Sequence, residues 1–159
     1  MNEELPSYEV YALRYARMTR PASHNFILHD AHDGTVDMDF YVWLIKGPGR
    51  AILVDTGFGE RGATQRNRPL DCCPIDALRY LGVEAEQIRD VILTHLHWDH
   101  AGNLDKLPNA TFHLEEAEAA FIKVLKRCGV QPEWTWEQAL RAIVKDLQYR
   151  AIKDPRERK

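Results

Sequence analysis

The chain has 159 residues, of which 45% are hydrophobic and 28% are charged, a balance typical of one soluble globular domain that excludes long disorder or a fibrous repeat. Its 21 basic and 24 acidic residues give a formal net charge of −3, so no basic excess is available for a nucleic-acid backbone or an anionic membrane. No apolar stretch approaches the roughly 18 residues of a transmembrane helix, and the polar start lacks the features of a secretory signal. We therefore expect a cytoplasmic protein that binds neither nucleic acid nor a membrane.

The first third of the chain is predicted to be mostly strand. Segments 8–15 and 38–45 are rich in aromatic and β-branched residues, and Gly47-Pro48-Gly49 turns the chain into a further apolar segment, 51–54. We expect 38–45 and 51–54 to form a hairpin of buried strands.

Strand then gives way to helix. After Asp55-Thr56-Gly57, the glycine- and arginine-rich segment up to Arg68 is predicted to be a polar loop. A helical pattern follows Pro74 and ends at Gly82. A short helical turn over 84–89 leads into an apolar strand over 90–94, and this strand–helix–strand order predicts a parallel crossover.

The rest of the chain is predicted to contain one more strand and two helices. The strand covers 110–114 and the first helix covers 115–127. The second helix, 136–152, begins with a capping box made by Thr135 and Gln138, and a charged tail follows it. The sequence shows no internal repeat and no long linker, so a single domain over 1–159 is expected.

Four potential metal ligands directly follow the predicted strand 90–94: His95, His97, Asp99 and His100. In an extended segment alternate side chains share a face, so His95 and His97 can reach one ion, while the next turn can direct Asp99 and His100 to a second. Imidazole with carboxylate suits zinc, with manganese or iron as alternatives, and the lack of a nearby thiolate favours catalytic over structural use. The cluster therefore predicts metal-assisted hydrolysis.

Two motifs carry a family resemblance. The segment Thr94-His-Leu-His-Trp-Asp-His-Ala-Gly-Asn103 resembles the signature of the metallo-β-lactamase superfamily, and Val54-Asp55-Thr56-Gly57 resembles its earlier strand-end motif. Flanking segments between about Tyr8 and Phe121 are further similar to the N-acyl-homoserine lactonase branch.

The resemblance implies an α/β fold, the αββα sandwich of that superfamily, with two zinc ions at one edge. His95 and His97 would bind the first ion, Asp99 and His100 the second, and Asp55 would orient the metal loop from beneath it. The resemblance further implies a zinc-dependent hydrolase of the quorum-quenching lactonase type. In such an enzyme a metal-activated hydroxide opens a lactone ring, and Asp99 would carry a proton to the leaving alkoxide. A thioester hydrolase of the glyoxalase II type is the alternative, because the shared metal loop does not choose the substrate.

The chain also departs from the family. Family members complete the site with two further histidines and a bridging aspartate from a later half of the domain, and this chain stops before that half. We therefore expect the N-terminal half of the sandwich plus C-terminal helices, with fewer than two tightly held zinc ions and poor turnover. The apolar faces of 41–45 and 51–54 would be exposed, which predicts self-association. A truncated metal-binding fragment without catalysis is a further alternative.

The other candidate residues have simpler explanations. His113 is interpreted as a half-buried strand histidine, and Asp146 and Asp154 as solvated carboxylates. The segment with His24, His29, His32, Asp30 and Asp33 is interpreted as a loop over the rim of the site. Trp134 and Trp136 are expected to anchor the last helix, and the cysteines, Cys72, Cys73 and Cys128, to be reduced thiols.

Overall fold

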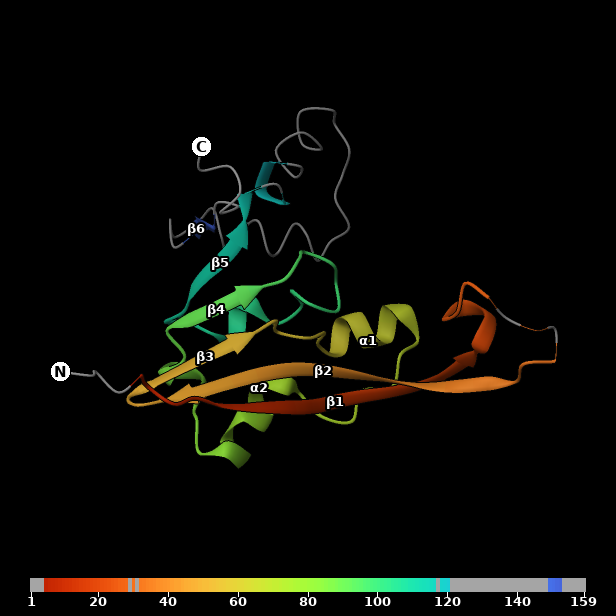
Figure 1. The fold of residues 1–159 in the computed structure, drawn as a ribbon, viewed down its shortest axis with the longest axis horizontal. Helices are drawn as coiled ribbons and strands as arrows, with labels where there is room; N and C mark the ends of the chain where they lie inside the picture. The colour runs from red at the N-terminus through yellow and green to blue at the C-terminus, as the bar shows by residue number, and fades with distance from the viewer. Residues whose placement is uncertain (1–4, 29, 31, 117, 121–148, 153–159) are drawn as a thin grey trace.

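The structure is a computed structural model that describes residues 5–28, 30, 32–116, 118–120 and 149–152. Within these residues six strands form one sheet in the order of the chain, from β1 to β6 (Figure 1). The strands are β1 (Glu9–Pro21), β2 (Thr35–Gly47), β3 (Arg50–Val54), β4 (Asp90–Leu93), β5 (Thr111–Glu115) and β6 (Tyr149–Ile152). The pairs β1–β2 and β2–β3 are antiparallel, and β3, β4, β5 and β6 run parallel.

The pairing of the strands confirms the predicted hairpin and crossover. Gly49 has a positive φ of 66° in the turn between β2 and β3, a conformation that costs glycine little. Along β2, Val42 and Leu44 are fully buried while Tyr41 and Trp43 are 42% and 45% exposed. This alternation with a period of two places one face of the sheet in the core and leaves the other face half open.

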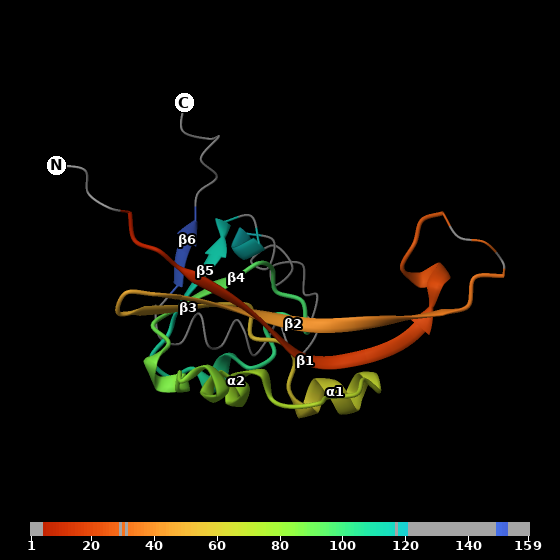
Figure 2. The same cartoon turned by 60° about the horizontal axis from the view of Figure 1, so that its bottom comes forward.

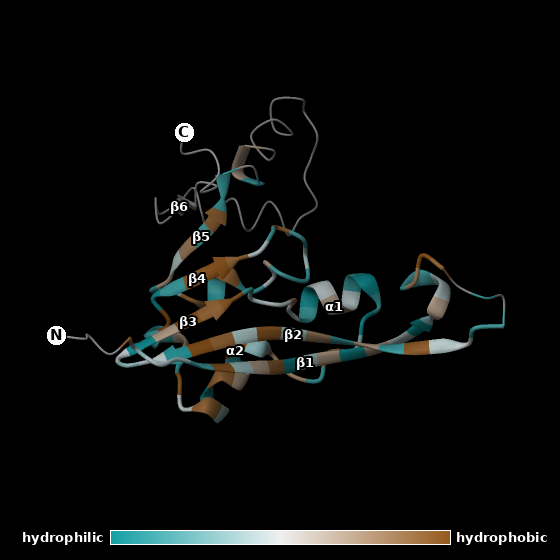
Figure 3. Ribbon diagram, viewed as in Figure 1, coloured by the Kyte–Doolittle hydropathy of each residue, from teal (hydrophilic) through white to brown (hydrophobic). Residues whose placement is uncertain are grey.

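The helices α1 (Glu60–Arg66) and α2 (Pro74–Ala77) lie on one face of the sheet. Figure 2 shows both on the same side of β1 and β2. Short 3-10 turns cover Ala22–His24, Leu78–Leu81, Ala85–Gln87 and Leu104–Lys106. Apolar residues run along β3, β4 and β5 (Figure 3), and the core beneath them is built from fully buried side chains that include Leu53, Leu78, Ile88, Val91 and Leu114.

The helix α1 corrects the prediction of a polar loop between residues 58 and 68. No apolar periodicity marks this segment, because its buried residues are the small Gly62 and Ala63. Their small size lets the helix approach the histidine loop: a Cβ added to Gly62 would lie 3.3 Å from the Trp98 ring. Packing against Trp98, a contact between distant segments, stabilises a helix that the local sequence does not indicate.

The structure near the end of the chain also differs from the prediction. Residues 149–152 form β6, paired in parallel with β5, so the predicted helix over 136–152 is wrong at its C-terminal end. Pairing with the edge of β5 overrides the helical pattern there. The strand β5 also extends through Glu115, and the helical conformation begins at Glu116, one residue later than predicted. Residues 121–148, with the rest of the two predicted helices, lie outside the described residues.

The ribbon formed by β1 and β2 extends past α1 and ends in the loop 22–34 (Figure 1). His24 belongs to the short 3-10 turn at this end, and the ring of His32 lies 2.8 Å from Asp30 on the surface. This loop therefore lies beyond α1, and its predicted place over the rim of the site stays a prediction.

Candidate metal centre

The histidine loop, residues 94–103, begins where β4 ends. Leu96 is 1% exposed and belongs to the core cluster, so it anchors the loop while His95 and His97 on either side stay accessible. The carbonyl of His97 then accepts hydrogen bonds from the N–H groups of His100 and Ala101, each at 3.0 Å. These two bonds close a turn that brings His100 back towards His95.

The turn gathers all four predicted ligands. The ring centroids of His95 and His97 are 4.6 Å apart, and those of His95 and His100 are 3.9 Å apart. The carboxylate of Asp99 lies 3.8 Å from Nε2 of His100. Side chains spread over six residues of sequence are thus packed against one another at the carboxyl end of β4.

Asp55 lies directly beneath this cluster. It is 5% exposed and has a positive φ of 60°, a backbone conformation that non-glycine residues adopt mainly at turns and functional sites. Its carboxylate accepts bonds from the N–H and hydroxyl of Thr94, at 2.8 Å and 2.9 Å, and from Nδ1 of His100 at 2.8 Å. Because Nδ1 of His100 is engaged by Asp55, Nε2 is the nitrogen that remains to bind a metal ion.

Two residues that the sequence reasoning did not single out connect the Asp55 turn to the histidine loop. Thr56 and Asn103 are 0% and 2% exposed. Thr56 donates to the carbonyl of His100 from its N–H at 2.7 Å and from its hydroxyl at 3.0 Å. The Asn103 amide donates to the carbonyl of Thr56 at 2.8 Å. Both residues belong to the quoted motifs, and their small polar side chains next to buried strands were the available signal.

The electrostatic environment differs between the histidines. Burial, and then the neighbouring rings of His100 and His97, lower the pKa of His95 below its ordinary value. Burial alone would also lower the pKa of His100, but its hydrogen bond to Asp55 and the charges of Asp55 and Asp99 raise it overall. The cluster thus combines a ring that favours the neutral form, which metals require, with a ring that is tied to a carboxylate.

The donor chemistry of these residues fits zinc, since imidazole nitrogen and carboxylate oxygen are its usual catalytic ligands. Asp55 further fits the carboxylate that commonly holds the second nitrogen of a ligating histidine. In the part of the chain that the structure describes, no three His, Cys, Asp or Glu side chains form a group that could hold a metal ion. The assignment of two ligands to each ion therefore stays a prediction.

His113 lies apart from this cluster, as predicted for a half-buried strand histidine. Its Nε2 lies 2.8 Å from Asp90 at the amino end of β4, and Arg50 donates to the same carboxylate at 3.2 Å. Cys72 and Cys73 are free thiols. The predictions on His29, Asp146, Asp154, Trp134, Trp136 and Cys128 lie outside the described residues.

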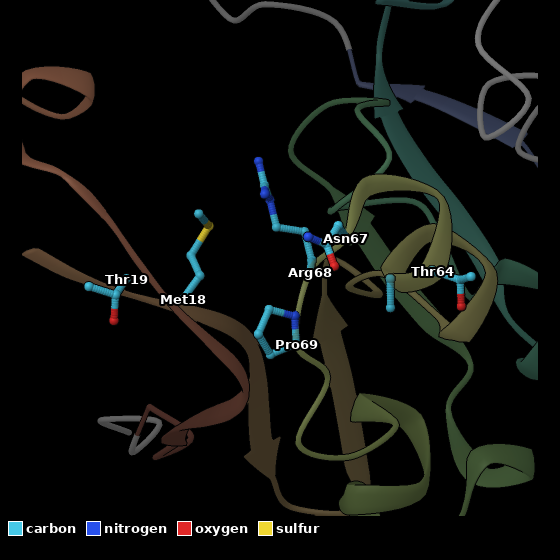
Figure 4. A pocket seen from close by; sticks show the side chains of 7 residues that line it. Met18, Thr19, Thr64, Asn67, Arg68 and Pro69 are labelled. Carbon is cyan, nitrogen blue, oxygen red and sulfur yellow. The ribbon is translucent and has the colours of Figure 1, made fainter. Parts of the chain in front are cut away.

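An open hollow of about 650 Å³ lies between β1 and the C-terminal end of α1 (Figure 4). It is lined by Met18, Thr19, Ala63, Thr64, Asn67, Arg68 and Pro69. None of the four motif ligands lines it, and α1 lies between the two features: Gly62 approaches Trp98 while Ala63 lines the hollow. The hollow is therefore a neighbour of the histidine loop and not part of it.

Comparison with known proteins defines the class. The family model of the metallo-beta-lactamase superfamily matches residues 41–157. Because this match covers well over half of the 159 residues, the chain belongs to the metallo-β-lactamase superfamily. The predicted family and its α/β fold are confirmed.

Particular relatives point to one branch. The N-acyl homoserine lactonase AttM of Rhizobium johnstonii is 26% identical over 124 residues, 70% of this chain and 44% of AttM. The hydroxyacylglutathione hydrolase of Methylobacillus flagellatus is 33% identical over 73 residues, 46% of this chain and 23% of that enzyme. The solved structure of AidC, a dizinc quorum-quenching lactonase, aligns with a TM-score of 0.64 at 22% identity, covering 94% of this chain and 60% of AidC.

The relatives differ in activity and in the length of the segment that matches this chain. Relatives and structural neighbours include several N-acyl homoserine lactonases, while the hydroxyacylglutathione hydrolase matches a shorter segment. The likeness to AidC shows a shared fold, and the chain spans less than half the length of AttM. No helix among the described residues is long and apolar enough to cross a membrane.

Proposed function

We propose that this chain carries half of the metal centre of a zinc-dependent lactonase. His95 and His97 hold one ion, Asp99 and His100 hold a second, and Asp55 orients His100. The observation that carries the proposal is the packing of the His97 and His100 rings against His95, at centroid distances of 4.6 Å and 3.9 Å, above the buried carboxylate of Asp55.

The described residues can perform three tasks in lactone hydrolysis. Bound zinc supplies a Lewis acid for a carbonyl oxygen and lowers the pKa of a coordinated water to near neutrality. Asp55 holds Nδ1 of His100, so this ring presents one fixed nitrogen. The Asp99 side chain is 25% exposed, and its carboxylate can carry a proton to the leaving alkoxide. Trp98 packs against the Phe58 ring and the guanidinium of Arg66, and these contacts anchor the loop that carries the candidate ligands.

The proposed substrate is an N-acyl-homoserine lactone. This choice is supported by AttM, which aligns over 70% of the chain, and by AidC, whose structure contains a product, N-hexanoyl-L-homoserine. Both proteins are longer than this chain, so the substrate is proposed for the completed site.

Fusion of this chain to the C-terminal half of AttM tests the substrate class. We expect the zinc-loaded fusion to open N-hexanoyl-homoserine lactone faster than it hydrolyses a β-lactam. The measurement is acid release followed with a pH indicator, and the control is the same fusion with His97→Ala. Hydrolysis of the β-lactam at a comparable rate, with no lactone opened, would contradict the proposal.

A thioester hydrolase of the glyoxalase II type is the second candidate. The 33% identity to the hydroxyacylglutathione hydrolase favours it, and the shorter aligned segment of 73 residues weighs against it. Adding an acylated glutathione thioester to the same assay separates the two activities. Faster hydrolysis of the thioester than of the lactone would reassign the enzyme.

For the chain alone we propose poor turnover, fewer than two tightly held zinc ions, and self-association. Val10, Tyr41 and Trp43 are 61%, 42% and 45% exposed on the sheet face opposite α1 and α2, and such an apolar face favours association. Size-exclusion chromatography combined with elemental analysis tests this. A monodisperse monomer that holds two zinc ions and opens lactones would contradict it.

A further inference from the structure

Tyr15 is a buried aromatic residue at a break in the pairing of β1 with β2. Arg14 pairs with Tyr41 and Ala16 pairs with Phe40, so Tyr15 is the extra residue of a β-bulge. Tyr15 and Ala16 are consecutive, yet they are 1% and 0% exposed, which strict strand alternation does not allow. Bulges can re-aim a side chain next to a site, and this one turns the phenol ring towards the histidine loop.

The Tyr15 ring packs against the turn that follows Asp55. It makes a T-shaped contact with Phe58 at a centroid distance of 5.0 Å. A Cβ added to Gly57 would lie 2.8 Å from Cζ of Tyr15, and Gly57 has a positive φ of 64°. Glycine at position 57 thus makes room for the phenol as well as for the turn.

The Tyr15 hydroxyl connects two loops. It donates to the main-chain carbonyl of Asp99 at 3.1 Å and accepts a bond from the N–H of Phe58 at 3.3 Å. The N–H on the other side of the Asp99–His100 peptide donates to the carbonyl of His97 at 3.0 Å. A planar peptide held on both sides fixes the positions of the two flanking Cα atoms, from which the Asp99 and His100 side chains leave the backbone.

We propose that Tyr15 is a positioning residue of the metal centre. Its hydroxyl holds the Asp99–His100 peptide so that both side chains face the same ion. This role rests on the proposed function, since it concerns the ligands of the second ion. Burial raises the pKa of Tyr15 above its ordinary value, so the phenol keeps its proton and stays a hydrogen-bond donor. Tyr15 acts only through the backbone and touches no substrate.

Replacing one hydroxyl tests the proposal. Tyr15→Phe keeps the ring and removes the O–H, and Tyr11→Phe is the matched control because the Tyr11 hydroxyl of the same strand donates to the exposed Glu9 carboxylate, at 2.7 Å. In zinc-free protein we expect Tyr15→Phe to speed amide hydrogen exchange at His100 and Ala101 about 10-fold. Exchange in β4 should stay at the wild-type rate, and Tyr11→Phe should change neither.

Metal binding provides the second measurement. Zinc affinity is measured by competition with a chelator. The affinity for the more weakly bound zinc ion should fall about 10-fold to 100-fold in Tyr15→Phe, which is the usual loss for a residue that supports a ligand. Placing 4-aminophenylalanine at position 15 restores an N–H donor to the Asp99 carbonyl, so it should recover most of both effects. A residue needed only for packing would show no such rescue.

Each other outcome is decisive. Unchanged exchange in Tyr15→Phe, unchanged zinc affinity, or faster exchange throughout β4 would overturn the positioning role. If neither the wild-type chain nor its fusion to the C-terminal half of AttM binds zinc, the proposed function fails, and exchange in zinc-free protein still decides whether Tyr15 holds the Asp99–His100 peptide.

Discussion

The two ends of β4 each carry an aspartate–histidine pair at 2.8 Å. At the carboxyl end Asp55 meets His100, and at the amino end Asp90 meets His113. The two pairs have the same chemistry but different surroundings. The Asp55 side chain is 8% exposed and its other contacts are to Thr94, whereas the Asp90 side chain is 24% exposed and also binds Arg50.

This difference shows what makes such a pair a candidate site. The cation of Arg50 satisfies Asp90, so the pair with His113 is part of a surface ion-pair network that is complete in itself. His100 instead packs against His95, and its second nitrogen lies beside the carboxylate of Asp99. An aspartate–histidine contact therefore indicates a metal site only where further ligands gather around the free nitrogen.

The largest expected contrast between the two ends is in metal affinity. His97→Ala should lower zinc affinity by about 100-fold or more, because direct ligands exceed the 10-fold to 100-fold range of supporting residues. His113→Ala should leave it unchanged, since His113 binds Asp90 at the other end of the strand. Zinc retained after dialysis, measured by elemental analysis, checks both. Loss of zinc in His113→Ala with retention in His97→Ala would reverse the assignment.

Replacing each of the two aspartates by alanine should change the free energy of unfolding by different amounts at the two ends of β4. Asp55→Ala should lower the free energy of unfolding by about 3 kcal/mol, because it removes a buried carboxylate that accepts bonds from the Thr94 N–H, the Thr94 hydroxyl and a histidine nitrogen. Asp90→Ala should cost less than about 1 kcal/mol, as partly exposed ion pairs do. Urea unfolding of the zinc-free variants measures both values.

Asp55→Asn refines this comparison. Asparagine tolerates the positive φ and keeps one carbonyl acceptor. The free energy of unfolding of Asp55→Asn should therefore lie between those of wild type and Asp55→Ala. Equal losses for Asp55→Ala and Asp90→Ala would mean that burial does not distinguish the two pairs.

Backbone packing at the carboxyl end should be intolerant of one extra methyl group. A Cβ added to Gly102 would lie 2.7 Å from the Gly57 carbonyl and 2.8 Å from Cα of Phe58, and main-chain atoms cannot move aside cheaply. Gly102→Ala should destabilise the fold by about 2 kcal/mol. The control Gly34→Ala should be neutral or slightly stabilising, since a Cβ there meets nothing within 4 Å. Thermal unfolding compares them, and a neutral Gly102→Ala would show that the two loops can separate.

The smallest effect concerns pH at the amino end. The hydrogen bond from His113 is the largest effect on the pKa of Asp90 and, with the smaller contribution of Arg50, holds it below its usual range although burial raises it. Its contribution to stability is therefore complete above the unfolded pKa of about 4 and is lost as pH falls through the lower folded value. The difference in unfolding free energy between wild type and Asp90→Asn should shrink between about pH 6 and about pH 3. A difference that grows towards low pH would contradict the sign of this shift.

Local patterns in the sequence were sufficient for much of the fold and for the choice of candidate ligands. The alternation in β2, the Gly47-Pro48-Gly49 turn and the strand 90–94 each specify structure through neighbours within a few residues, so the hairpin and the parallel crossover were predictable. The spacing of His95, His97, Asp99 and His100 likewise depends on one short segment. The sequence by itself therefore determined the family and the candidate metal ligands.

Tertiary structure decided what depends on contacts between distant segments. The helix α1 forms because Gly62 can approach Trp98, and residues 149–152 become a strand because the edge of β5 offers hydrogen-bond partners. The bulge at Tyr15 shifts the register of β1, and only this shift places a phenol beneath Asp99. None of these contacts leaves a local periodic signal, because each depends on where the chain returns in space and not on the residues that flank it.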